Sequence, residues 1–143
     1  MEWPWIRLWR WAARRPNGRD ARALFLRQQP QLQEAFFAAA AASGKPRGLR
    51  WKACEWEPAV EFARERATGS LTALAGVVIA FEAVEGGDME GVAAVGNLRN
   101  ASAVFFFHGG QWRTTGKAVF NLNPDEALVR FQNQYERLTA DSR

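Results

Sequence analysis

Residues 71–84 read LTALAGVVIAFEAV, and this stretch decides the fold of the chain. Large apolar residues occupy both odd and even positions, with Val77 and Ile79 on one face and Leu74 and Val78 on the other. Successive side chains of a strand point to opposite faces, so this pattern predicts a strand that is covered on both sides. Such a strand lies in the middle of a sheet rather than at its edge.

One or two further strands are predicted before this central one. From residue 48 apolar and polar residues alternate (LRWKAC), and Pro58 should end the strand. Residues 59–66 fit either a strand or a helix. We favour a strand, because the sequence ATGS at 67–70 is typical of a hairpin turn that leads into the central strand.

Two more strands are predicted after it. Residues 85–91, EGGDMEG, are too rich in glycine and acidic residues to be anything but a loop. Residues 101–108 contain VFFF, which indicates cover on both faces, and Gly109-Gly110 is a strong signal for a two-residue hairpin turn. The return strand is expected over residues 111–121. One of its faces carries Trp112, Ala118 and Phe120.

Helical patterns flank these strands. Residues 20–43 predict a helix with Asp20 as its N-cap, and Pro30 should kink this helix or split it in two. The alanine run at 38–42 favours a helix and offers a face on which another element can pack closely. Gly44 then ends the helix.

The last element is predicted to be a helix that starts at Asn123-Pro124-Asp125-Glu126, with an N-cap Asn, Pro at the first position and Glu at the third. The apolar stripe of this helix is Leu128, Phe131, Tyr135 and Leu138. The sequence therefore predicts an α+β protein. We expect an antiparallel four- or five-stranded meander with N-terminal helices and one C-terminal helix packed on it, and residues 20–143 as a single domain.

Composition limits the class of protein. The chain has 143 residues, 48% hydrophobic and 24% charged, which is typical of one globular domain. No apolar run approaches the roughly 20 residues that a membrane-spanning helix needs. The first arginines are interleaved with apolar residues, unlike those of a secretory signal. We therefore expect a cytoplasmic protein.

Positive charge is distributed unevenly along the chain. The net charge is +4, yet residues 1–52 hold eleven Lys/Arg against three Asp/Glu, a net charge of +8, and the rest holds eight against twelve, a net charge of −4. Either the basic third meets an anionic partner, or it packs on the acidic remainder of the same chain.

Signals for catalysis are weak. Cys54 is the only cysteine and His108 the only histidine, and we interpret both as structural, because no activating partner is recognisable. Four Cys/His ligands for zinc are not available, and the acids at 82–90 do not follow the spacing of a calcium loop. No phosphate-binding glycine motif or nucleophile elbow occurs. The sequence indicates no catalytic residue, no metal and no cofactor.

Residues 1–15, MEWPWIRLWRWAARR, form the unusual part of the chain and hold four of its seven Trp. Pro4 suits a first helical turn, and Pro16-Asn17-Gly18 ends the segment. At about 100° per residue, Trp5 and Trp9 gather on one side and the arginines on the other, which predicts an amphipathic helix. The residues expected to bind a membrane or a partner are Trp3, Trp5, Arg7, Trp9, Arg10, Trp11, Arg14 and Arg15.

Three interpretations of this segment are open. Trp at headgroup depth and Arg on phosphate suit docking on an anionic membrane surface or a partner protein. The same residue types suit stacking on nucleic acid, which we favour less. In the third, the helix packs its Trp face on the sheet of its own domain. We favour a non-catalytic interaction or scaffold protein that docks through residues 3–15, peripheral to a membrane or a larger assembly.

The alternative function is a small-molecule or enzymatic pocket. A long helix against a curved antiparallel sheet often leaves a pocket, as in nuclear-transport-factor-like and cystatin-like domains, although this is a likeness of architecture only. We expect the large aromatic residues of the sheet to be core, with a pocket wall as their second possible role. These residues are Trp51, Trp56, Phe62, Phe106 and Trp112.

Overall fold

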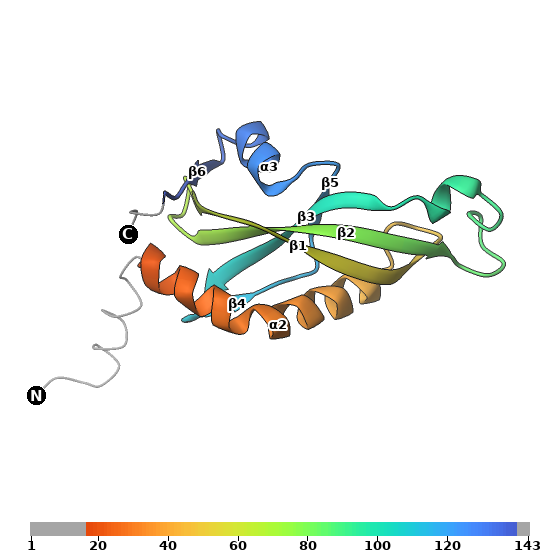
Figure 1. Ribbon diagram of the computed structural model, residues 1–143, viewed down its shortest axis with the longest axis horizontal. Coiled ribbons are helices and arrows are strands. Elements are labelled where there is room, and N and C mark those ends of the chain that lie inside the picture. The colour runs from red at the N-terminus through yellow and green to blue at the C-terminus, as the bar shows by residue number, and fades with distance from the viewer. Residues whose placement is uncertain (1–16, 140–143) are drawn as a thin grey trace, which may run out of the picture.

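The computed structural model describes residues 17–139. One long helix, α2 (Gly18–Ala42), lies along one face of a six-stranded antiparallel sheet, and a short helix, α3 (Pro124–Arg130), lies on the other face (Figure 1). This arrangement confirms the predicted α+β class with an antiparallel sheet, but the sheet has six strands rather than four or five, and one helix rather than several precedes it in residues 17–139. The strands are β1 (Leu49–Glu65), β2 (Leu71–Ala83), β3 (Arg99–His108), β4 (Gln111–Arg113), β5 (Ala118–Phe120) and β6 (Tyr135–Arg137).

The sheet order is β4-β3-β2-β1-β6, and β5 also pairs with β3. Strand β2 is therefore central, as its two-sided apolar sequence predicts, and its residues from Leu71 to Val77 are all buried. The turn between β3 and β4 is Gly109-Gly110, where both residues have positive φ, as the two-glycine signal predicts. The loop after β2 contains one short 3-10 helix, η1 (Ala93–Gly96).

Helix α2 begins earlier than predicted and is not split. Its N-cap is Asn17 rather than Asp20, and the Asn17 side chain accepts hydrogen bonds from the first-turn N–H groups. The helix continues through Pro30. A proline removes one backbone hydrogen bond, but Phe25 on one side of it and Phe36 on the other are fully buried against the sheet and hold both halves in place.

Strand β1 does not end at Pro58 but runs on to Glu65, so the ambiguous residues 59–66 are largely strand. The register between β1 and β2 shifts between Trp56 and Val60, which indicates a bulge that contains Pro58. Over these residues the other edge of β1 has no partner strand within the described part of the chain. A proline that lacks an N–H is tolerated at such a bulge on an edge.

The predicted return strand is interrupted. Its two parts, β4 and β5, pair with opposite ends of β3, and residues 114–117 bulge out between them. Gly116 in this bulge has φ of +82° and touches the backbone of α2, because a Cβ at this position would lie 2.4 Å from the nitrogen of Ala40. Only glycine over an alanine face allows this approach, which agrees with the close packing expected of the alanine run.

The C-terminal prediction is half wrong. Helix α3 begins as expected, with a capping box between Asn123 and Glu126, but it ends at Arg130. The chain then turns, and β6 pairs with β1 at Ala63–Glu65. The segment with Phe131, Tyr135 and Leu138 is therefore not helical. A continued helix would leave the end of β1 without the backbone hydrogen bonds that β6 makes with it.

The main core lies between α2 and the sheet and is built from aromatic rings. The ring centroid of Phe25 lies 5.4 Å from that of Phe105 and 5.3 Å from that of Trp112. The centroid of Phe36 lies 5.8 Å from that of Trp51. Edge-to-face pairs of this kind add about 0.5–1.5 kcal/mol each to the free energy of burial.

Candidate functional site

The residues predicted to dock, between Trp3 and Arg15, lie outside the described residues, as does the helix predicted for them. The body that follows carries little net charge. Residues 17–139 hold fourteen Lys/Arg against thirteen Asp/Glu, whereas residues 1–16 hold four Arg against one Glu. Residues 1–16 thus carry +3 of the net charge of +4.

Ion pairs occupy part of the charge on the body. Arg137 binds Glu61 at 3.0 Å and Asp125 at 2.6 Å, and thereby ties β6 to β1 and to α3. Arg50 binds Glu82 at 3.0 Å across the β1–β2 pair, and this contact joins the basic first third of the chain to the acidic remainder.

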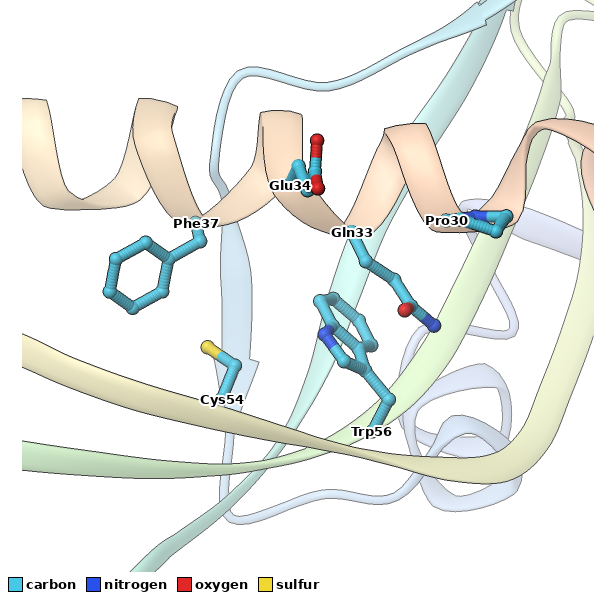
Figure 2. Close-up of a pocket in the computed structure, with 6 residues that line it drawn as sticks. All are labelled: Pro30, Gln33, Glu34, Phe37, Cys54 and Trp56. Carbon is cyan, nitrogen blue, oxygen red and sulfur yellow. The ribbon is translucent and has the colours of Figure 1, made fainter.

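A groove of about 500 Å³ runs between α2 and the unpaired edge of β1 (Figure 2). Phe37 and Gln33 enter it from the helix, and Cys54 and Trp56 enter it from the strand. The Cys54 sulfur points toward the helix. Burial raises the pKa of the Cys54 thiol to about 11, so the sulfur stays protonated and weakly nucleophilic at neutral pH. The groove therefore offers apolar contact rather than covalent chemistry.

His108 is exposed at the end of β3, and its carbonyl accepts a hydrogen bond from Arg113 Nε at 3.4 Å. The acidic loop is closed by its own contacts, because the Glu90 carboxylate accepts a hydrogen bond from the N–H of Gly86. Within residues 17–139, no group of three or more His, Cys, Asp or Glu is placed to hold a metal ion.

Of the aromatic residues predicted as core or pocket wall, Trp56 lines the groove between α2 and β1, and Trp51 lines the second cavity described below. Trp51 and Trp112 are buried, with exposed fractions of 7% and 3%. Their indole N–H groups donate to the carbonyls of Lys45 and Ala21. The remaining three, Trp56, Phe62 and Phe106, are half-buried.

A second cavity, of about 340 Å³, lies beyond the C-terminal end of α2. One wall is the segment after the helix, with Lys45 and Pro46, and the other is the bulge between β4 and β5, with Lys117. Buried Trp51 and half-buried Phe120 supply part of its apolar lining. Sequence reasoning missed this cavity, since its two lysines come from loops that are far apart in the chain and only the fold brings them together.

Comparison with protein-family models, with curated proteins and with solved structures gave no match to this chain. None of the helices in the described part of the chain is long and apolar enough to cross a membrane. Function must therefore be argued from the residues themselves.

Proposed function

We propose that this chain is a non-catalytic interaction protein that docks through residues 3–15 on an anionic surface, of which a phospholipid membrane is the first candidate. Trp at headgroup depth supplies apolar burial and Arg supplies contacts to phosphate. Each basic residue near such a surface contributes about 1 kcal/mol. A cytoplasmic location follows from this proposal.

The observation that carries the proposal is the cover on the sheet. Helix α2 covers one face of the sheet, and its residues Phe25 and Phe36 are fully buried. The buried aromatic residues of this face pack against one another, and they come from α2 and from the strands. This cover on the α2 face supports our assignment of the four N-terminal Trp to a surface outside the domain.

A nearly neutral body supports the same proposal. If the whole domain were basic, any anionic surface would attract all of it, and the N-terminal segment would have no special role. Here +3 of the net charge of +4 lies in the first sixteen residues, which also hold four Trp. Positive charge and apolar area therefore act together in this segment.

The test is co-sedimentation of the full chain with phosphatidylglycerol vesicles at low salt and at about 0.5 M salt, where charge attraction is strongly screened. We expect binding that salt weakens. The variant Arg7→Glu/Arg10→Glu should bind at least about 30-fold more weakly, because two contacts of about 1 kcal/mol are removed and then reversed. Trp5→Ser/Trp9→Ser should also lose binding without a change in melting temperature.

The matched control is Arg27→Glu/Lys52→Glu, which makes the same change of charge at two exposed positions of the body. It should bind the vesicles nearly as well as the parent chain. Equal losses in both charge variants would show attraction by overall charge and contradict docking through the N-terminal segment. A lower melting temperature in the Trp variant would assign these side chains to the core.

The alternative function is a small-molecule-binding or enzymatic pocket in the sheet, and the enzymatic form of it needs polar groups that converge on a cavity. In the groove of Figure 2 the polar side chains are Gln33 and Glu34 from one helix, beside a protonated thiol. This set does not pair a nucleophile with a base, so docking remains the function that we propose.

A further inference from the structure

The cavity at the C-terminal end of α2 combines an apolar floor with a basic rim. Its lining includes the buried or half-buried Trp51, Phe120 and Pro46, which we call the floor, and the exposed Lys45, Thr115 and Lys117, which we call the rim. Its volume of about 340 Å³ lies at the lower end of the range for small-molecule sites, which starts near 300 Å³. We refer to it as the lysine-rimmed pocket.

Both walls of this pocket are fixed by contacts of their own backbone and side chains. On one side, Gly116 is in contact with the backbone of α2 at Ala39 and Ala40, and its N–H donates to the Thr114 hydroxyl. On the other side, the indole N–H of Trp51 donates to the Lys45 carbonyl at 2.8 Å, so the floor holds the rim segment in place. A pocket with fixed walls binds without a large ordering cost.

The two rim charges are not neutralised by the described residues. No ion pair with Lys45 or Lys117 occurs in residues 17–139, although Arg50 nearby in sequence has its partner in Glu82. Both lysine side chains are exposed at the mouth, while the rings below them are buried or half-buried. Ammonium groups above an aromatic floor match a ligand with one charged end and one flat apolar end.

We propose that the lysine-rimmed pocket binds a small planar organic anion, an aromatic ring that carries a carboxylate. The ring lies against Trp51 and Phe120, and the carboxylate accepts hydrogen bonds from Lys45 and Lys117. This site is independent of residues 3–15 and adds a ligand to the docking function.

A structural explanation of the two lysines makes a different prediction. The last turn of α2 contains no basic residue, and a cation beyond a helix C-terminus stabilises its exposed carbonyls. If Lys45 served only that purpose, its replacement would lower stability and leave the binding of anions unchanged. The experiment therefore measures binding and melting temperature on the same variants.

The experiment is a titration of the full chain with naphthoate, followed by the NMR signals of the Trp51 indole N–H and the Gly116 amide N–H. We expect saturable shifts of both signals. Naphthamide, which keeps the ring but not the charge, and inorganic sulfate, which keeps charge but not the ring, should each bind about tenfold more weakly or worse.

The variant Lys45→Glu/Lys117→Glu changes two exposed side chains and should bind naphthoate at least about tenfold more weakly, with its melting temperature preserved. Arg27→Glu/Lys52→Glu, with the same change of charge away from the pocket, should bind like the parent chain. The proposal is overturned if neither signal shifts, if both variants bind naphthoate equally, or if sulfate binds as tightly as naphthoate.

Discussion

On one face of the sheet a 25-residue helix buries a continuous array of aromatic rings, whereas on the other face a seven-residue helix covers one end only. The α2 face is held by large rings such as Phe36 and Phe105, both fully buried. The α3 face is held by a small cluster around Leu74 and Leu128. The same strands therefore support two packing layers of very different apolar area.

The two layers also rely on different interactions. Burial of apolar area stabilises the α2 face and grows with ring size. The α3 face depends more on polar contacts that fix the chain, such as the hydroxyl of buried Ser102, which donates to the Leu122 carbonyl at 2.8 Å, and the ion pairs of Arg137. Substitutions at neighbouring positions of one strand should therefore have unequal effects on the free energy of unfolding.

The largest effect is expected at Phe105, which points to the α2 face and packs against Phe25 and Phe36. Phe105→Ala should lower the free energy of unfolding by about 3–5 kcal/mol, because it removes a ring and leaves a cavity. Its neighbour Phe106 points to the opposite face and is half-buried, so Phe106→Ala should cost only about 1 kcal/mol. Urea denaturation of both variants measures the difference, and equal costs would break the comparison of the faces.

A smaller effect is expected on the α3 face. Leu128→Ala should lower the free energy of unfolding by about 2–3 kcal/mol, because Leu128 is 4% exposed but packs in a small cluster. Val129→Ala is the matched control, since Val129 is 58% exposed, and it should change stability by less than about 0.5 kcal/mol. A cost at Leu128 as large as that at Phe105 would show that the two faces contribute equally.

The smallest effect concerns Cys54, where the α2 face opens into the groove. With a pKa of about 11, the folded protein should react with iodoacetamide at pH 8 at least about tenfold more slowly than the urea-unfolded chain, and the rate should rise with pH. Folding favours the protonated thiol, so this contribution to stability is complete below about pH 8.5 and is lost as the pH rises through 11. Equal rates in folded and unfolded chains would show that the groove opens to solvent.

Local sequence signals were sufficient where one residue type decides the backbone. The two-sided apolar pattern of residues 71–84 placed β2 at the centre of the sheet, and Gly109-Gly110 gave the hairpin turn. The capping residues Asn123 and Glu126 marked the start of α3. In each case the physical cause lies within a few residues of the signal.

Local sequence signals do not predict the structure where contacts with a segment distant in the sequence determine it. Pro58 remains inside β1 because the adjacent edge is unpaired, and β6 exists because β1 offers it a partner at Ala63–Glu65. The lysine-rimmed pocket could not be predicted for the same reason, since Lys45 and Lys117 meet only when the sheet is complete. No local propensity reports such contacts.

The two edges of the sheet have a consequence for the behaviour of the chain at high concentration. On one side, β1 presents its unpaired stretch with Lys52 exposed, Pro58 and two register shifts. On the other side, the bulge at 114–117 divides the outer strand into two pieces of three residues each. Neither edge is a regular template for a strand from a second molecule. Crowding of many copies at high concentration should therefore not lead to edge-to-edge aggregation.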